Sequence, residues 1–577
     1  MTCSICLGVK MMAAEPLMAG YFRNRVGDFG IEGWRSDTSV WANAEKTSGT
    51  VRFRNRSMSE RFHVRTNPHL SRFAMASSLL IDAAPLTTGV PGLDYILNGG
   101  YAANRAHLIE GRPGSGKTTL GLQFLLEGVV RGETCLYITL SESKRELLSV
   151  AAKHGWSLDG IEIFELVPPE LSLDPKQQQS LVYASDLELG ETVRMTLEAM
   201  ERVKPKRVVF DSLSEIRLLS EGNLRYRRQV LALKSYFLLN EATVLMLDDL
   251  TSGDEDTNLH SISHAVIRLE QVVPAFGSER RRLAVTKMRG TSFRGGYHDL
   301  VIERGGLRIF PRLVAAEHHR PFVPEPVPVP SNVPELDAVL GGGLNRGTST
   351  LIVGPSGAGK STLALGYVWA GLERGERVLI VSFDETIGIL MARARSVGYD
   401  LTPHIDTGQL RIEQIDPAEV SPGEFAGRVR EAVSRDGAQI VVIDSLTGYL
   451  HAMPEQPYIV LQMHEMLTYL NQQGVVTLLL LAQHGMVGQM ASPIDMTYLS
   501  DCVVLLRFFE ASGRIRRALS VLKKRVGAHE DTIREFRIDK GGLRVGEPLE
   551  QFRGVLTGVP TFDGDRRALL PKRNFAQ

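Results

Sequence analysis

The strongest constraint on the fold is a glycine-rich pattern that occurs twice in the chain. Residues 106–120 read AHLIEGRPGSGKTTL, and residues 349–363 read STLIVGPSGAGKSTL. In each segment a short apolar run ends at a glycine and a helix-forming run begins at a lysine, which predicts a strand, a loop and a helix. Glycines in such a loop let backbone amides turn inward around phosphates, and the helix N-terminus adds favourable positive charge. Both segments therefore predict nucleotide binding.

Each loop offers one lysine for the β- and γ-phosphates and an adjacent hydroxyl for magnesium. The predicted magnesium-binding hydroxyls are those of Thr118 and Ser361. The residues expected to contact ATP are Gly111, Pro113, Gly114, Ser115, Gly116, Lys117, Thr118 and Thr119 in the first loop, and Gly354, Ser356, Gly357, Ala358, Gly359, Lys360, Ser361 and Thr362 in the second.

The two loops belong to a longer duplication. Their lysines, at positions 117 and 360, stand 243 residues apart, and so do Asp94 of TGVPGLDYILNGG and Asp337 of SNVPELDAVLGGG. A chain of 577 residues is also too long for one hydrophobic core. We therefore predict a tandem repeat of one nucleotide-binding domain, at residues 78–313 and 331–546.

Three segments lie outside the predicted domains. Residues 1–77 are rich in Arg, Ser and Asn without sustained periodicity, so we expect disorder there, or an over-extended reading frame with Met75 as the physiological start. Residues 314–330 contain RPFVPEPVPVP, which predicts a semi-rigid proline-rich linker. Residues 547–577 are expected to form a disordered basic tail.

Composition restricts the kind of partner and compartment. Lys+Arg and Asp+Glu are both 66, so no global field attracts the chain to nucleic acid or to anionic membrane. The four cysteines, two of them in apolar strand-like runs, are typical of a reducing compartment, and we expect a cytoplasmic protein. No apolar run approaches the roughly 18 residues of a membrane span.

Strand-like and helix-like segments alternate in both repeats, which predicts an α/β fold with mostly parallel sheets covered by helices. Ligands bind at the carboxyl ends of the strands in such sheets. There the runs RVVFDS and QIVVID deliver Asp211 and Asp444, the Walker B positions, where a carboxylate helps to hold magnesium.

Hydrolysis also requires a group that orients the attacking water. The candidates are the acids that end the strand after each loop-bearing helix: Glu142, beside Ser141, in the first repeat, and Asp384 and Glu385 in the second. The alternative explanation for each is a solvent-exposed turn. Recurrence of the acidic element at the same place in both repeats favours a catalytic role.

These motifs together resemble the tandem form of the KaiC family of RecA-like ATPases. The segments that carry the resemblance are VPGLDYILNGG, DSLSEIRLL, DSLTGYL, KMRGTSF and KKRVGAHEDTIREF, spread over residues 78–546. The resemblance implies a double-ring homohexamer with ATP held between neighbouring subunits. Lys287 and Arg289, and likewise Lys523 and Arg525, would then reach the neighbour's nucleotide, where a cation stabilises transition-state charge. A charged, solvent-exposed hairpin edge is the alternative explanation for them.

The sequence departs from the family at several positions. The family has paired glutamates after the loop-bearing helix, whereas Ser141 replaces the first acid in one repeat and Asp384 in the other. Phe293 stands where the family has a histidine, although His529 keeps its counterpart. The resemblance therefore implies a signalling-type ATPase rather than a clock protein, with a KaiB-like protein or a histidine kinase as candidate partner.

The resemblance also suggests autophosphorylation in the second repeat. In the family, a Ser-Thr pair lies four and three residues before an aspartate that opens an apolar strand, and here that aspartate is Asp501. Counting back gives Thr497 and Tyr498, so Thr497 is the favoured acceptor and nearby Ser500 the second candidate. Asp384 would accept the hydroxyl proton. The alternative is that Thr497 caps or packs a loop.

Two functions of other classes remain open from the sequence. A RecA-type DNA-dependent ATPase, either a recombinase or a helicase motor, would share the same core. Arg225, Arg227 and Arg228 keep this alternative open, although arginines at such spacing more often form a solvent-exposed helix face. Residues 251–258 are acidic, however, and residues 483–496 contain no Lys or Arg, so we expect no nucleic-acid binding. A non-hydrolysing ATP-dependent scaffold is the other alternative.

Overall fold

A computed structural model describes most of the two predicted domains. The described residues are 43–47, 50–54, 63–65, 84–166, 184–220, 222–250, 257–274, 277–318, 327–451, 456–483, 497–511, 513–557 and 561–562. The chain divides into two compact units, Met1–Asp82 and Ala83–Gln577.

In the first unit the described residues form a small antiparallel sheet in the order β1-β2-β3. Its strands are β1 (Asn43–Thr47), β2 (Thr50–Arg54) and β3 (His63–Arg65). The rest of residues 1–77 lies outside the described part of the chain, so the disorder expected there stays a prediction.

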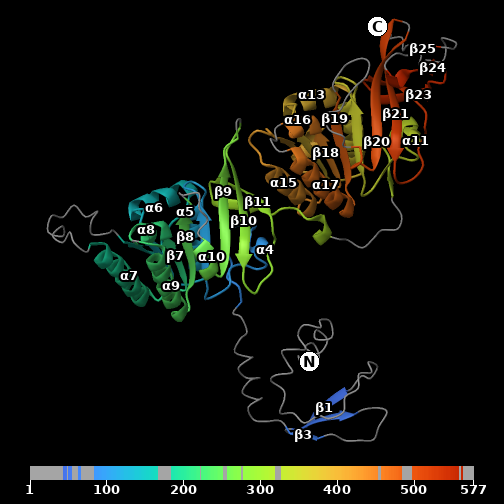
Figure 1. Cartoon of the computed structure of the whole chain (residues 1–577). Coiled ribbons are helices and arrows are strands. Elements are labelled where there is room, and N and C mark those ends of the chain that lie inside the picture. Colours follow the sequence, from blue (N-terminus) through green and yellow to red (C-terminus); the bar gives the residue numbers. More distant parts are fainter. Residues whose placement is uncertain are drawn as a thin grey trace. The chain divides into compact units, whose positions relative to one another are not determined.

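The first repeat is built on a nine-stranded sheet in the order β12-β11-β10-β9-β4-β8-β7-β5-β6 (Figure 1). From β6 to β9 all neighbours are parallel, whereas β9 to β12 pair antiparallel. The strands are β4 (Ala106–Gly111), β5 (Cys135–Thr139), β6 (Ile161–Glu165), β7 (Arg207–Asp211), β8 (Thr243–Asp249), β9 (Ala265–Val272), β10 (Arg280–Met288), β11 (Tyr297–Glu303) and β12 (Gly306–Phe310).

Helices cover both faces of this sheet because successive strand residues point to opposite sides. Ile109 of β4 packs in one core with Phe124 and Leu147, whereas its neighbour Leu108 packs in the other with Phe237. The helices on the first face are α5 (Lys117–Val130) and α6 (Lys144–His154), and those on the second are α7 (Ala184–Val203), α8 (Leu213–Leu218) and α9 (Asn223–Leu239). Shorter helical segments are α4 (Leu93–Ile96), α10 (Thr257–Ile262) and η2 (Ala315–His318).

The second repeat has the same topology. Its nine-stranded sheet has the order β17-β16-β18-β19-β15-β20-β21-β22-β23, which repeats the first sheet read from β6, with the same change from parallel to antiparallel pairing after β20. The strands are β15 (Ser349–Gly354), β16 (Val378–Ser382), β17 (Leu410–Gln414), β18 (Ile440–Asp444), β19 (Val476–Ala482), β20 (Cys502–Ala511), β21 (Arg514–Lys524), β22 (Arg534–Asp539) and β23 (Gly542–Pro548).

Helices again cover both faces of the second sheet (Figure 1). They are α12 (Lys360–Glu373) and α13 (Ile387–Ser396) on one face, and α15 (Pro422–Ser434), α16 (Leu446–His451) and α17 (Gln456–Gln472) on the other. The remaining short elements are β13 (Pro328–Val329), α11 (Pro334–Val339), β14 (Leu344–Asn345), α14 (Thr402–Asp406), β24 (Phe552–Arg553), η3 (Val555–Thr557) and β25 (Thr561–Phe562).

Side-chain caps fix the start of the helix that follows each predicted catalytic acid. Ser143 caps α6 by accepting a hydrogen bond from the Glu146 amide at 3.3 Å, and the Glu146 carboxylate accepts one from the Ser143 amide at 2.7 Å. Thr386 caps α13 through the amide of Ile389 at 3.5 Å. Such caps satisfy amides that lack partners within the helix, so each acid lies on a well-defined strand-to-helix turn.

The fold confirms the predicted class, two tandem RecA-like α/β domains with mostly parallel sheets. Residues 319–326 of the expected linker and most of the expected tail lie outside the described residues. Among the residues that the structure describes, no helix has both the length and the apolar character needed to cross a membrane.

Candidate active sites of the two repeats

The two glycine loops adopt the same backbone conformation. Gly114 and Gly116 have φ angles of 81° and 105°, and Gly357 and Gly359 have φ angles of 76° and 105°. These left-handed values strain residues with a Cβ atom, so glycine is needed at all four positions. Each loop leads directly into the first turn of a helix, α5 or α12, whose free amides face the loop.

The strand end before each loop also requires glycine. A Cβ atom added to Gly111 would lie 2.5 Å from the carbonyl oxygen of Leu269, and one added to Gly354 would lie 2.6 Å from that of Leu506. Among the other predicted contact residues, Pro113, Gly114, Ser356 and Gly357 are exposed, Gly116 and Gly359 are half-buried, and Ser115, Thr119, Ala358 and Thr362 are buried.

Both lysines fold back beneath their loops. The Nζ of Lys117 donates to the carbonyls of Gly111 at 2.8 Å and Arg112 at 3.0 Å. The Nζ of Lys360 donates to the carbonyl of Gly354 at 2.9 Å and to that of Pro355 at 2.9 Å. Burial lowers the pKa of Lys360, opposed by the carboxylates of the same site.

The Walker B carboxylates lie beside the loop hydroxyls. Thr118 Oγ1 donates to Asp211 Oδ2 at 3.5 Å, and the Ser361 hydroxyl is the corresponding side-chain partner of Asp444. Burial raises the pKa of both aspartates, since a charged carboxylate loses hydration there.

These residues fit a magnesium nucleotide. The left-handed glycines of each loop let backbone amides turn toward phosphates, and a buried Ser115 Oγ has no hydrogen-bond partner within the described part of the chain. In that same part, no three His, Cys, Asp or Glu side chains form a metal-binding group. Magnesium would therefore be held in the way it usually is beside nucleotides, by one carboxylate, a hydroxyl, water and the phosphates themselves.

Glu142 lies on the turn after β5. Its backbone is fixed by Thr139, whose Oγ1 donates to the Glu142 carbonyl at 2.7 Å and accepts from the Glu142 amide at 3.0 Å. Its Oε2 is buried without a hydrogen-bond partner among the described residues. Burial, followed by the nearby Asp211 carboxylate, raises the pKa of Glu142.

Glu385 has the same backbone contacts, through Ser382, but a different partner for its carboxylate. Arg393 of α13 forms an ion pair with it at 2.7 Å and lies 3.9 Å from Asp444. Burial raises the pKa of Glu385, and Arg393 opposes this increase. The equivalent position in α6 is Val150, which offers no cation to the acid of the first repeat.

Asp384 contacts residues at the start of α16. The Ser445 hydroxyl donates to its Oδ2, and a Cβ atom added to Gly448 would lie 2.5 Å from its Oδ1. In the first repeat, the positions of Asp384 and Gly448 are taken by Ser141 and Glu215. An acid missing from the turn is thus present on the facing helix, which comparison of the repeats over DSLSEIRLL and DSLTGYL could have indicated.

The cations predicted to act on a neighbouring subunit contact carbonyls of their own chain. Lys287 Nζ donates to the carbonyl of Ser263 at 2.8 Å and also to that of His260, and Arg289 donates to that of Ser261 at 2.5 Å. These contacts hold the end of α10 against β10.

In the second repeat the equivalent cations hold the segment of the candidate phosphoacceptors. Lys523 Nζ donates to the carbonyls of Thr497 at 2.8 Å and Ser500 at 2.7 Å. Arg525 donates to the Tyr498 carbonyl at 2.7 Å and forms an ion pair with Asp501 at 3.2 Å. Thr497 is exposed whereas Ser500 is fully buried.

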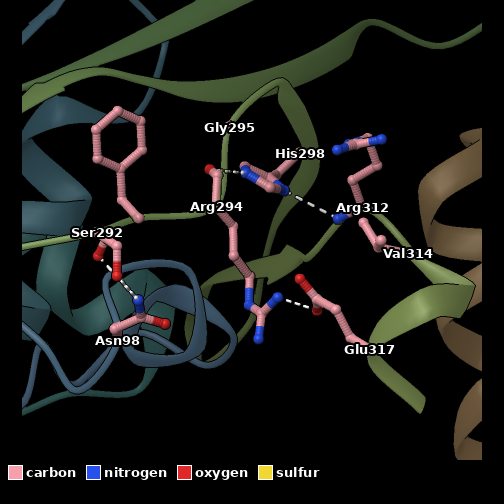
Figure 2. A pocket seen from close by; sticks show the side chains of 9 residues that line it. Asn98, Ser292, Arg294, Gly295, His298, Arg312, Val314 and Glu317 are labelled. Carbon is pink, nitrogen blue, oxygen red and sulfur yellow. Dashed lines mark hydrogen bonds and ion pairs between the residues drawn. The ribbon is translucent and has the colours of Figure 1, made fainter. Parts of the chain in front are cut away.

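A pocket of about 380 Å³ is lined mainly by residues that come after Lys287 and Arg289 in the sequence (Figure 2). Arg294 forms an ion pair with Glu317 there, and the His298 ring bridges the Arg294 carbonyl at 3.0 Å and the Arg312 amide at 2.9 Å. No residue of the glycine loop or of the Walker B strand lines it. The lining residues are Asn98, Ser292, Phe293, Arg294, Gly295, His298, Arg312, Val314 and Glu317.

Two contacts of the first site were not indicated by the sequence patterns. The Tyr137 hydroxyl donates to Asp211 Oδ2 at 2.5 Å, and Asp249 Oδ1 lies 2.5 Å from Lys117 Nζ. The equivalent residues in the second repeat are Ile380 and Ala482. Aligning the two repeats strand by strand would have drawn attention to both differences.

The two segments whose lack of positive charge predicts no nucleic-acid binding, residues 251–258 and 483–496, lie mostly outside the described residues. Residues 251–256 and 484–496 are not described, so the expected lack of nucleic-acid binding stays a prediction. Arg225, Arg227 and Arg228 lie on α9, with Arg228 exposed and the other two half-buried.

The fold and the paired sites define a tandem P-loop protein of the RecA-like class. A family model described as the KaiC ATPase matches residues 86–314 and 329–550. The chain belongs to the KaiC ATPase family, which confirms the resemblance.

The curated relatives that the chain matches are also KaiC proteins, at 24% to 26% identity. The chain is 26% identical over 492 residues to "Circadian clock protein KaiC3" of Synechocystis sp., covering 83% of this chain and 94% of that protein. It is 24% identical over 525 residues to "Circadian clock oscillator protein KaiC" of Acaryochloris marina, covering 88% of this chain and 97% of that protein. It is also 26% identical over 490 residues to "Circadian clock protein KaiC2" of Synechocystis sp..

Proposed function

We propose that this KaiC-family ATPase binds Mg-ATP at both glycine loops, hydrolyses it slowly and acts in cytoplasmic signalling as a homohexamer. The observation that carries the proposal is the recurrence, on two sheets of identical topology, of a loop lysine, a hydroxyl beside a buried aspartate and an acid on the next turn. These are the groups that phosphoryl transfer needs: a phosphate clamp, a magnesium shell and a water-orienting residue.

In this proposal, each group of a site has a separate role. Lys117 and Lys360 bind phosphate oxygens, and bound magnesium supplies charge neutralisation at the β- and γ-phosphates. Glu142 and Glu385 orient water for attack on the γ-phosphate. Lys287, Arg289, Lys523 and Arg525 exchange their carbonyl partners for phosphates of the neighbouring subunit's nucleotide.

Nucleotide counting tests the binding sites. Lys117→Ala and Lys360→Ala should each remove about half of the bound nucleotide, since each loop holds one nucleotide per chain. Nucleotide retained in full by the double variant would contradict the proposal. Because ligand at a subunit interface stabilises the assembly, ATP should also promote hexamer formation in sedimentation. The same sedimenting species with and without ATP would exclude an interfacial site.

The same preparation separates the signalling ATPase from a DNA motor. Single-stranded DNA should leave the hydrolysis rate unchanged, whereas strong stimulation would favour the recombinase or helicase alternative. Phosphate release that is undetectable in a folded, ATP-bound hexamer would instead favour the non-hydrolysing scaffold.

We further propose that the second repeat phosphorylates itself on Thr497, with Asp384 accepting the hydroxyl proton. Exposure of Thr497, whose carbonyl accepts from Lys523, supports this choice over the buried Ser500. Incubation with labelled ATP and magnesium should place label in the peptide that contains Thr497. Label retained in full after Thr497→Ala together with Ser500→Ala would mean that this segment is not the acceptor.

A KaiB-like protein or a histidine kinase is the proposed partner class, by analogy with the family. Co-sedimentation of the ATP-bound hexamer with a purified KaiB-like protein should show a nucleotide-dependent complex. A complex that forms equally well with the Lys117→Ala, Lys360→Ala double variant would not depend on nucleotide and would contradict this part of the proposal.

A further inference from the structure

Asp249 lies at the last position of β8, directly against the lysine of the first glycine loop. Its Oδ1 is 2.5 Å from Lys117 Nζ, and the lysine and aspartate side chains are 7% and 29% exposed. The other carboxylate oxygen accepts a hydrogen bond from Ser214 Oγ at 3.4 Å. The ion pair is therefore partly shielded from water, where charges interact more strongly than at an open surface.

The ion pair with Asp249 occupies the third N–H donor of Lys117. A lysine ammonium has three N–H donors and no acceptor. In the first repeat, the three are matched by the carbonyls of Gly111 and Arg112 and by Asp249. In the second repeat, Lys360 donates to two carbonyls, those of Gly354 and Pro355, among the residues that the structure describes. A phosphate oxygen must displace a partner of Lys117, whereas Lys360 keeps a donor for it.

The position of Asp249 is equivalent to Ala482 of the second repeat. In the sheets, Asp249 pairs with Gly111 and Ala482 pairs with Gly354, the glycines that open the two loops. The backbone amides of Asp249 and Ala482 also donate to equivalent hydroxyls, Ser214 Oγ at 3.3 Å and Thr447 Oγ1 at 3.1 Å. The difference is therefore one side chain on an otherwise matched backbone.

Tyr137 makes a second, independent contact of the same kind. Its fully buried hydroxyl donates to Asp211 Oδ2 at 2.5 Å, so the Walker B carboxylate of the first site has a donor from its own domain. Ile380 takes this place on β16 and has no donor group. In the first repeat, both groups that receive Mg-nucleotide thus already have strong partners.

We propose that Asp249 is a specificity-determining residue of the first nucleotide site, one that competes with phosphate for Lys117 and makes this site bind nucleotide more weakly than the second. The inference rests on the proposed function of the loops. A carboxylate beside the lysine also repels each added phosphate charge, so the discrimination is greater against ATP than against ADP. Asp249 therefore sets which nucleotide the first site holds when both sites are supplied from the same pool.

Site-resolved binding tests the inference in the full-length protein with magnesium and fluorescent ATP or ADP. In a Lys360→Ala background, Asp249→Ala should tighten ATP binding by roughly three- to thirtyfold, which is the effect expected from removing a partly buried ion pair. ADP binding should tighten by less. Asp249→Asn keeps the shape of the side chain and should give a smaller gain. In a Lys117→Ala background, the reverse change Ala482→Asp should weaken ATP binding at the second site.

The possible results separate the inference from the function on which it rests. Unchanged ATP affinity after both Asp249 substitutions would overturn the inference and leave nucleotide binding intact. Weaker binding after Asp249→Ala would also overturn it, because the carboxylate would then be helping to hold magnesium. No nucleotide at the first site in any variant, with normal binding at the second, would overturn the proposed function of the first repeat and the inference together.

Discussion

The two active-site regions share a backbone but hold different groups in place. In the first repeat the groups expected to receive Mg-nucleotide have partners, Lys117 with Asp249 and Asp211 with Tyr137, whereas an oxygen of Glu142 has none within the described residues. In the second, the acids have partners instead. Glu385 pairs with Arg393, Asp384 accepts from Ser445, and Lys360 keeps a free donor among those residues.

A duplicated site can thus differ in how it binds nucleotide and in how it holds its acids without a change of fold. Partners on the groups that receive Mg-nucleotide raise the cost of binding it, whereas partners on the acids fix their orientation and protonation. Under the proposed function, the second site would bind nucleotide readily and hold its acid in place through Arg393. The first site would bind nucleotide more selectively, and its acid has no such cation beside it at the equivalent position, Val150.

The largest expected effect comes from removing each acid. Glu142→Gln in a Lys360→Ala background, and Glu385→Gln in a Lys117→Ala background, should retain ATP but slow single-turnover hydrolysis by roughly 10² to 10⁴ fold, the range for loss of a general base. Phosphate release from one site at a time gives the comparison directly. Hydrolysis at the parental rate in either Gln variant would mean that its acid is a turn residue and that the two sites do not differ in their base.

The sequence was sufficient to predict the fold because its evidence is periodic and repeated. Two copies of the loop motif at the same spacing, followed by alternating apolar strands and helices, predict the tandem α/β domains that the structure contains. The placement of Asp211 beside Thr118 could also be predicted, since Asp211 ends one parallel strand and Thr118 begins the helix that follows another, both at the carboxyl edge of the same sheet.

The partners of the site residues could not be predicted in the same way. Tyr137 and Asp211 are 74 residues apart, and they meet because β5 lies next to β7. Asp249 reaches Lys117 because β8 lies next to β4. Strand order is set by packing of the whole sheet, and periodicity within one strand carries no information about its neighbours. Contacts of single side chains across that order therefore require coordinates.

A smaller effect is expected from exchanging the residues that distinguish the two acids. Arg393 opposes the increase in the pKa of Glu385 that burial causes, so Arg393→Gln should raise this pKa further. A general base acts when deprotonated, and the acidic limb of the pH–rate profile at the second site should move to higher pH.

The matched control for that exchange is Val150→Arg at the first site. A cation placed there favours the charged form of Glu142, so the acidic limb should move to lower pH, opposite in sign to the effect of Arg393→Gln. Single-turnover rates across pH, with one site active in each background, measure both shifts. Limbs that stay in place in both variants would show that the acids do not control the profile.

The smallest expected effect concerns the hydroxyl of Tyr137. It is buried and donates to the buried carboxylate of Asp211, and a hydrogen bond to a charged group contributes about 1.5–3 kcal/mol. Tyr137→Phe should therefore lower the free energy of unfolding of the first domain by about that amount, and it should leave the Walker B carboxylate freer to bind magnesium.

Tyr101 supplies the control, since its ring is also buried in this domain but its hydroxyl has no hydrogen-bond partner among the described residues. Tyr101→Phe removes an unsatisfied polar atom and should be neutral or stabilising in urea denaturation. Equal losses in the two variants would mean that the hydrogen bond of the Tyr137 hydroxyl contributes nothing measurable. Asp249 would then be the remaining difference between the described groups that are expected to receive Mg-nucleotide at the two sites.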